Sequence, residues 1–244
     1  MSGYIATLIF DPAERAQRRH LKRDQVLRWL RLNTWSTADV LREVVGFSSR
    51  QAVQKLLQGL CNDELIRNAA ISGEFGRPVI VWGITAHGAA MAALEDEPVS
   101  IRTFEPSKVN PLTMQHALDV QRLQLRAQNG GWQWQAIGGE LSRSEAKYAD
   151  AVALRVDGSR VAIEVERTVK TAKRYAEILI AHLEARKQGK WDWIYYLSPD
   201  KAISNRVRRS YEEIRVALWR GKRVQITEAH MVPFKFYAYD DNWI

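Results

Sequence analysis

The sequence predicts a mixed α/β fold that is divided into two domains. Residues 18–94 carry three short helical patterns followed by two strand-like runs, and residues 112–197 alternate between helical and strand-like patterns. Between them, residues 95–111 hold three of the seven prolines and show no helical period. The predicted organisation is therefore an N-terminal domain over residues 1–98, a linker over residues 99–111 and a C-terminal domain over residues 112–244.

Composition excludes several classes of protein. Of the 244 residues, 46% are hydrophobic and 26% are charged, a balance that is typical of a folded soluble protein. No apolar run is long enough to span a membrane, and the first ten residues lack the cationic start of a secretory signal. The single cysteine, Cys61, excludes an intramolecular disulfide. We expect a cytoplasmic protein that does not insert into a membrane.

The net charge of +8 is unevenly distributed along the chain. Residues 1–98 carry a net charge of +1, whereas residues 99–244 carry +7. Such an excess favours binding to a polyanion through the release of counterions. Because many basic soluble proteins bind no polyanion, charge alone favours nucleic acid only weakly.

The N-terminal domain begins with three predicted helices. The first covers residues 18–32, and the second runs from Ala38 to Val45 and ends at Gly46. The third opens at a capping box, Ser48 to Gln51. It buries one apolar face and exposes side chains that can donate hydrogen bonds to bases or phosphates: Ser49, Arg50, Gln51, Gln54 and Lys55.

A predicted hairpin follows, with strands over residues 66–71 and 79–84 and with Arg77 near its tip; a closing helix is capped by Thr85. This order of elements resembles a winged-helix domain. In such domains the third helix enters the major groove and the hairpin contacts phosphates, so the resemblance implies DNA binding by the five residues above and by Arg77. A winged helix that binds protein is the alternative, because the net charge here is only +1.

The C-terminal domain carries its candidate chemistry on a second hairpin. After a helix over residues 111–128 and a strand over residues 132–137, two strand-like runs cover residues 148–156 and 160–168. Glu164 and Glu166 share one face of the second run. A three-residue loop, Asp157-Gly158-Ser159, pairs Val156 with Arg160 and places Asp150 across from Glu166, whereas a two-residue loop turns Asp150 to the opposite face. We predict the three-residue loop.

Three carboxylates on a largely apolar hairpin require compensation, since unpaired buried acids are costly. A divalent cation supplies it, and clustered carboxylate oxygens with water suit Mg²⁺ or Mn²⁺. The sequence therefore predicts a metal site formed by Asp150, Glu164 and Glu166. Salt bridges are the alternative, with Arg143, Lys147 and Arg167 as candidate partners.

The string of Asp150 followed by Glu164-Val165-Glu166 resembles the Asp…(Asp/Glu)-x-Lys core of restriction-endonuclease-like nucleases. The resemblance implies a restriction-endonuclease-like α/β/α domain with a mixed sheet, in which Asp150 and Glu164 hold the metal and Glu166 adds a ligand or positions the attacking group. Glu166 departs from the family pattern, which has lysine there. Some branches recruit a lysine from the following helix, and Lys170 is the candidate, with Lys173 and Arg174 as rivals; we expect Thr168 to cap that helix.

The whole chain, over nearly all of residues 20–200, resembles the MobC-type plasmid relaxases of the replication–relaxation family. The winged helix, the run His116-Ala117-Leu118-Asp119-Val120 on a helix and the carboxylates above carry this resemblance. It implies a conjugative relaxase, a metal-dependent endonuclease that nicks one strand at a plasmid origin of transfer. The implied partners are duplex and single-stranded plasmid DNA, other relaxosome proteins and a coupling protein.

Two further residues are candidate accessories of the site. His116 opens the family motif, although a histidine on an amphipathic helix is usually structural. Glu140 can add a ligand from the segment before Tyr148, and Glu145 is equally placed. Two other functions remain open: a non-catalytic winged-helix regulator, and a nuclease of the same fold that cuts both strands.

Overall fold

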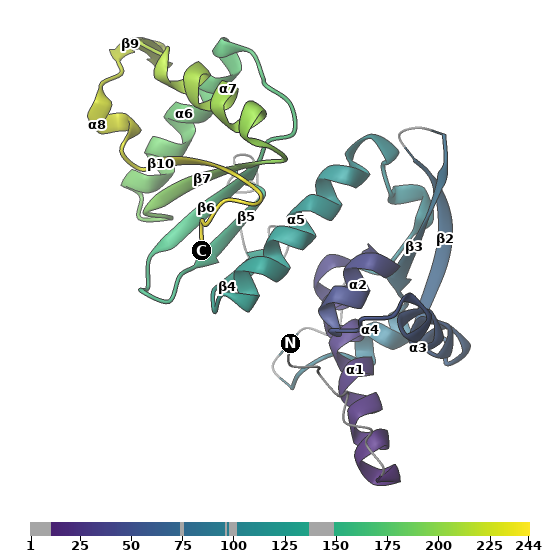
Figure 1. The fold of residues 1–244 in the computed structure, drawn as a ribbon. Coiled ribbons are helices and arrows are strands. Elements are labelled where there is room, and N and C mark those ends of the chain that lie inside the picture. Colours follow the sequence, from purple (N-terminus) through teal and green to yellow (C-terminus); the bar gives the residue numbers. More distant parts are fainter. Residues whose placement is uncertain (1–10, 74–75, 96, 98–101, 137–148) are drawn as a thin grey trace, which may run out of the picture. The chain divides into compact units, whose positions relative to one another are not determined.

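The computed structural model describes residues 11–73, 76–95, 97, 102–136 and 149–244. The chain divides into two compact units, Met1–Leu118 and Asp119–Ile244 (Figure 1). Helices and strands are interspersed in both units, which confirms the predicted mixed α/β class. Within the described ranges, no helix combines the length and the apolar character needed to cross a bilayer.

The described residues of the first unit contain four complete helices, the first part of α5 (Pro111–Asn129) and a small sheet. The elements are α1 (Pro12–Asn33), β1 (Trp35–Thr37), α2 (Ala38–Val44), α3 (Arg50–Asn62), β2 (Ile66–Ser72), β3 (Pro78–Ile84), α4 (Ala86–Met91) and a 3₁₀ turn, η1 (Pro106–Lys108). The sheet has the order β1-β3-β2, and both strand pairs are antiparallel. The predicted helices and hairpin are thus present, while β1 was not predicted because three residues are too few to show a period.

Local signals in the sequence explain the boundaries of these elements. The Ser49 hydroxyl accepts a hydrogen bond from the N–H of Gln51 and caps α3, so the predicted capping box, with Ser48 as the cap, is wrong by one residue. The Thr85 hydroxyl accepts from the N–H of Gly88 and caps α4, as predicted. Gly46 has a φ of 64° after α2, a conformation that favours glycine. At Gly83 in β3, a Cβ atom would overlap the ring of Phe104, so only glycine allows this close approach.

The second unit is built on a five-stranded mixed sheet. Its elements are the rest of α5 (Pro111–Asn129), which crosses the boundary between the units, β4 (Gln133–Ala136), β5 (Ala151–Leu154), β6 (Arg160–Val165), α6 (Ala172–Lys187), β7 (Trp193–Ser198), α7 (Lys201–Glu212), β8 (Val216–Trp219), β9 (Lys222–Gln225), α8 (Glu228–Met231) and β10 (Phe234–Ala238). The sheet order is β10-β7-β6-β5-β4. β6, β7 and β10 are parallel, and β4 and β5 are antiparallel to their neighbours.

Alternating side chains build a core on each face of this sheet. On one face, Ala162 of β6 and Tyr196 of β7 pack with Tyr175 and Leu179 of α6 and with Tyr211 of α7. Figure 1 shows α6 and α7 together on this side of the sheet. On the other face, the strands pack against the second half of α5 and the C-terminal tryptophan, with Leu123, Ala127, Ile163, Leu197 and Trp243 among the buried residues. Residues of even number in β6 therefore face α6.

The turn between β5 and β6 differs from the prediction. Leu154 pairs with Arg160, so the predicted pairing of Val156 with Arg160 is wrong. The N–H of Arg155 donates to the carbonyl of Ser159 (2.9 Å), and Gly158 has a φ of 83°. A three-residue loop needs its positive φ at the last position, so the glycine fixes the loop at residues 156–158 and not at 157–159.

This correction moves Asp150 by two positions along β6. Its N–H donates to the carbonyl of Ile163 (2.8 Å), which places Asp150 beside Glu164 and not across from Glu166. A shift of two residues keeps the side chain on the same face of the sheet. The predicted sharing of one face by the three acids survives the error in register.

Candidate active site

Three carboxylates lie close together where β5 begins and β6 ends. Asp150 directly precedes β5, Glu164 lies near the end of β6, and Glu166 follows β6. The negative charges of Asp150 and Glu166 both raise the pKa of Glu164, and that of Asp150 also raises the pKa of Glu166. The structure therefore brings together the three acids that the sequence singled out.

Asp150 is fixed by the end of the neighbouring strand. Its Oδ2 accepts a hydrogen bond from the backbone N–H of Val165 (2.7 Å). Val165 lies beyond the last residue pair of β5 and β6, so the Asp150 carboxylate accepts from an N–H that has no partner in β5. Position 150 thus has a structural reason for a short acid as well as a chemical one.

Glu164 faces α6 and contacts a histidine that the sequence analysis did not assign to the site. The Nε2 of His182 lies 3.1 Å from the Oε1 of Glu164, whose side chain is 13% exposed. Burial raises the pKa of Glu164 well above its usual range, and burial lowers the pKa of His182 to about 3. His182 is therefore neutral at physiological pH, and the pair is held by a hydrogen bond.

One signal in the sequence could have identified His182. It lies in the buried stripe of α6 together with Ile178 and Leu179. A histidine within such an apolar stripe needs a buried polar partner. The spacing of the stripe predicts which helix face it occupies, but not which strand residue it meets.

Glu166 pairs with Lys170. The carboxylate is 3% exposed and the Lys170 ammonium contacts its Oε2. Burial raises the pKa of Glu166, and the hydrogen bond from Lys170 counteracts this shift. The hydroxyl of Tyr175 also interacts with Glu166, and it accepts a hydrogen bond from the N–H of Lys170 (3.0 Å).

The helix after β6 begins later than predicted. α6 starts at Ala172, and the Thr171 hydroxyl accepts from the N–H of Arg174, so the predicted cap at Thr168 is wrong. Both threonines are possible caps in the sequence, and the structure has a loop over residues 166–171, between the end of β6 and the start of α6. Lys170 therefore reaches the acids from this loop and not from the helix.

Further cations lie near the acids. The charges of Lys170 and Arg174 partly offset the rise in the pKa of Glu164. The charge of Arg206, on α7, partly offsets the rise in the pKa of Tyr175. Arg206 and Arg174 are exposed to solvent. The acids are thus accompanied by positive charges that an approaching phosphate can meet.

Two tyrosines of the second unit, Tyr175 and Tyr211, have raised pKa values. Tyr175 and Tyr211 are buried, and burial raises the pKa of Tyr175 to about 12 and that of Tyr211 still further from its usual range. Neither hydroxyl is therefore set up to ionise and attack a phosphate. Tyr148 lies outside the described residues.

Arg167 has a different partner from the one considered in the salt-bridge alternative. It contacts the carboxylate of Asp119, on α5, which is 5% exposed and also accepts a hydrogen bond from the Tyr239 hydroxyl (3.1 Å). Odd-numbered Arg167 points to the α5 face, away from the side on which Glu166 meets Lys170. Asp119 thus anchors the segment that follows β6.

Removing the Asp119 carboxylate should destabilise the second unit. We expect Asp119→Ala to lower the free energy of unfolding by about 2–4 kcal/mol, because Arg167 and the Tyr239 hydroxyl lose a buried partner. Arg122→Ala is the matched control: its guanidinium lies 3.6 Å from Asp119 and is 42% exposed, so we expect a loss below about 1 kcal/mol. Urea unfolding of the three proteins measures the difference, and equal losses in both variants would contradict the assigned role.

The other predicted residues lie elsewhere. Within the described parts of the chain, no group of three or more His, Cys, Asp or Glu side chains is arranged to hold a metal ion. His116 is half-buried on α5 and belongs to the first compact unit. Glu140, Glu145, Arg143 and Lys147 lie outside the described residues.

The predicted DNA-contacting face of α3 is open to solvent. Ser49, Arg50, Gln51, Gln54 and Lys55 are all exposed, and Val53, Leu57 and Leu60 are buried on the opposite side. The Arg50 guanidinium lies 3.4 Å from Asp39 of α2 and remains 81% exposed. Arg77 is exposed beside the turn of the β2–β3 hairpin. Six side chains predicted to bind DNA are thus available to a ligand.

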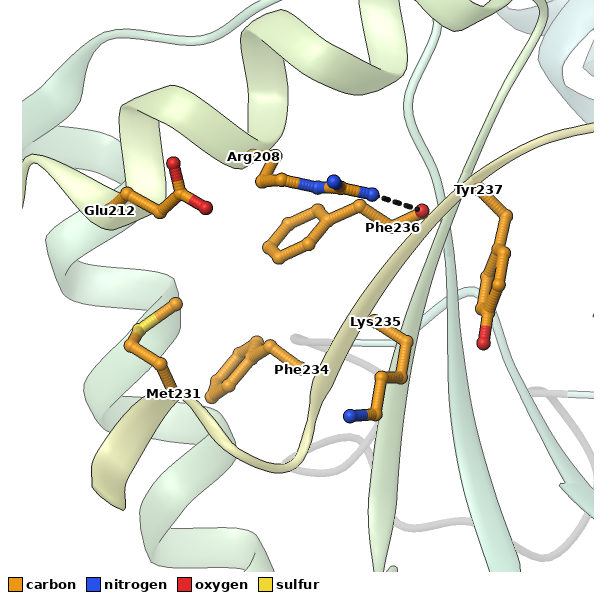
Figure 2. A pocket seen from close by; sticks show the side chains of 7 residues that line it. All are labelled: Arg208, Glu212, Met231, Phe234, Lys235, Phe236 and Tyr237. Carbon is orange, nitrogen blue, oxygen red and sulfur yellow. Dashed lines mark hydrogen bonds between the residues drawn. The ribbon is translucent and has the colours of Figure 1, made fainter. Parts of the chain in front are cut away.

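A pocket lies at the edge of the sheet formed by β10. Figure 2 shows its lining from α7, α8 and β10: Arg208, Glu212, Met231, Phe234, Lys235, Phe236 and Tyr237. The Arg208 guanidinium stacks over the Phe236 ring and donates to the Phe236 carbonyl (3.1 Å). The pocket is separated from β6 by β7, so it is distinct from the carboxylates.

Comparison of the chain with protein-family models, with curated proteins and with solved structures finds no match.

Proposed function

We propose that the chain is a metal-dependent DNA endonuclease of the relaxase type, with a winged-helix unit that binds DNA and a restriction-endonuclease-like unit that nicks it. The observation that carries this proposal is the placement of Asp150, Glu164 and Glu166 together at the ends of two neighbouring strands, with Lys170 against them. Buried acids beside cations are the groups from which phosphodiesterases build a metal and phosphate site.

The order of elements supports the nuclease half of this proposal. A helix, three strands, a helix and a fourth strand parallel to the third follow one another as α5, β4, β5, β6, α6 and β7. The acids lie where the antiparallel β5 starts and β6 ends. This is the arrangement that the resemblance to restriction-endonuclease-like enzymes leads us to expect, with an acid opening one strand and an acid-x-residue pair on the next.

The described side chains form no preassembled group of three or more His, Cys, Asp or Glu ligands, but carboxylate oxygens are the donors that Mg²⁺ and Mn²⁺ prefer. Burial is the largest cause of the raised pKa of Glu164, and the charges of Asp150 and Glu166 raise it further, so the ionised acids repel one another and a cation would stabilise them. Asp150 and Glu164 would hold the ion; when bound, it would lower the pKa of a coordinated water and neutralise charge on the phosphate. Lys170 would place its charge beside the scissile phosphate, and Glu166 would hold Lys170 in place.

The first unit supports DNA binding through α3 and the β2–β3 hairpin. The exposed polar face of α3 carries no carboxylate over residues 49–55. A three-stranded sheet, β1-β3-β2, supports the hairpin as a wing. We infer a winged helix that places α3 in the major groove of duplex DNA and Arg77 against a phosphate.

Arg50→Ala in the full chain should weaken binding to duplex DNA by about 1–3 kcal/mol if its guanidinium contacts a guanine, because a bidentate contact to a base is lost. Arg19→Ala, which removes an exposed arginine from α1, is the control and should change affinity little. Fluorescence anisotropy at several salt concentrations measures both effects. Equal losses in the two variants would assign Arg50 a general electrostatic role and not base recognition.

From the resemblance to MobC-type relaxases we also propose the substrate and the partners. The substrate is DNA at a plasmid origin of transfer, bound as duplex and as single strand, and the partners are relaxosome proteins and a coupling protein. Incubating the full chain and Mg²⁺ or Mn²⁺ with supercoiled plasmid that bears a candidate origin tests the reaction. Nicked circles support a relaxase, and linear plasmid as the main product supports a nuclease that cuts both strands.

A second candidate function is a winged-helix regulator without catalytic activity. The observation that favours it is that each acid already has a partner in the protein: the N–H of Val165 for Asp150, His182 for Glu164 and Lys170 for Glu166. Under this reading the contacts stabilise the fold and no metal is needed. DNA binding with no cleavage under any metal condition would support it.

A further inference from the structure

His182 is held among aromatic rings on the inner face of α6. Its side chain is fully buried, and its ring centroid lies 5.4 Å from that of Trp191, 6.4 Å from that of Tyr196 and 6.1 Å from that of Phe234. The Nε2 atom lies 3.1 Å from the Oε1 of Glu164. The Nδ1 atom is buried and has no hydrogen-bond partner in the described parts of the protein.

These surroundings select one tautomer of the ring. A neutral imidazole carries a proton on one nitrogen and a lone pair on the other. A proton on Nδ1 would leave a buried N–H without an acceptor, which costs more than an unpaired lone pair at the same place. The proton therefore belongs on Nε2, where it donates to the Glu164 carboxylate.

We propose that His182 is a positioning residue that donates its Nε2–H to Glu164 and holds this carboxyl group in the orientation that binds a divalent cation; this role rests on the proposed function. The aromatic rings fix the plane of the imidazole, so the second carboxylate oxygen keeps a defined direction. Partners of this kind around a ligand commonly contribute 10–100-fold to metal affinity.

The tautomer can be measured without any activity. Nitrogen-15 NMR of the histidine rings in the metal-free full chain should show His182 as the neutral Nε2–H form. In Glu164→Gln the same tautomer should persist with a weaker hydrogen bond, seen as a change in the Nε2–H proton shift, which also assigns the resonance. An Nδ1–H tautomer in the wild-type protein would overturn the proposal.

Metal affinity tests the consequence of this hydrogen bond. His182→Gln keeps an amide donor at the position of Nε2, whereas His182→Leu keeps the apolar bulk and removes the donor. Calorimetric titration with Mn²⁺ should show affinity reduced by about 10–100-fold in His182→Leu and by no more than a few-fold in His182→Gln. Melting temperatures of both variants separate this effect from a loss of fold.

The outcomes distinguish a failure of the role of His182 from a failure of the proposed function. Equal Mn²⁺ affinity in the wild type and both variants would overturn the role of His182 and leave the proposed function standing. A wild-type chain that binds no Mn²⁺ would overturn the proposed function and this role together. If His182→Leu does not fold, two results still test the proposal. A large loss of Mn²⁺ affinity in a folded His182→Gln variant would overturn it, and so would the absence of the Nε2–H tautomer from the wild type.

Discussion

Glu164→Gln is expected to abolish metal-dependent nicking, with a fall in rate on the order of 10³-fold or more, and to leave the protein folded. The glutamine amide can still accept a hydrogen bond from His182, but it supplies no negative charge for a divalent cation. Removing one of three neighbouring carboxylates also relieves repulsion in the metal-free protein, so the melting temperature should stay the same or rise slightly.

Asp150→Asn should have the same effect on the rate for the same reason, and it provides an internal comparison. Its amide oxygen can still accept from the N–H of Val165, whereas Asp150→Ala removes that acceptor and should cost about 1 kcal/mol of stability in addition. If nicking persists in these variants while the melting temperature falls sharply, the acids are partners in structural salt bridges and not metal ligands.

Lys170→Ala is expected to reduce the single-turnover nicking rate by a factor on the order of 10²–10³, the usual effect of removing one electrostatic stabiliser of a transition state. Restriction-endonuclease-like nucleases have a lysine at the position of Glu166. In this chain, Lys170 contacts Glu166 directly. Lys170→Arg should restore only part of the rate, because the guanidinium is larger and its charge is more dispersed. DNA affinity should change little, since one phosphate contact among many contributes little to binding.

Two controls separate catalysis from stability in this prediction. Lys170→Ala leaves the buried Glu166 without its cation, so a double variant, Lys170→Ala with Glu166→Gln, should recover stability but not the rate. Lys173→Ala and Arg174→Ala remove the neighbouring exposed charges on α6 and should each have a smaller effect. Full activity in Lys170→Ala with loss of activity in Arg174→Ala would assign the charge to Arg174.

The local parts of the fold could be predicted from the sequence. The β2–β3 hairpin follows from alternating apolar residues, and the start of α4 follows from the side chain of Thr85. The start of α3 was predicted one residue early, because Ser48 and Ser49 are both possible caps. β10 was not predicted, because its place is set by parallel pairing with β7, whose residues lie about forty positions earlier in the chain. Pairing over such a distance leaves no signal in the short apolar run of residues 234–238.

The candidate site shows the same limit. The three acids share one face because side chains alternate along a strand, and the observed register differs from the predicted one by two residues, a shift that preserves the face. The register depended on where Gly158 lies within its loop, and one residue of error there displaced Asp150 by two positions. The contacts with His182 and Asp119 join separate elements, so neither could be read from spacing along the chain.

The most direct measurement of the central claim is the metal dependence of plasmid nicking by the purified full chain, with Glu164→Gln as the matched protein. We expect nicked circles with Mg²⁺ or Mn²⁺, none with EDTA, and none from Glu164→Gln at a concentration at which it binds the same DNA. Nicking at equal rates by both proteins, or no nicking by a wild-type chain that binds the plasmid, would contradict the assignment of Asp150 and Glu164 as the metal ligands of a nuclease.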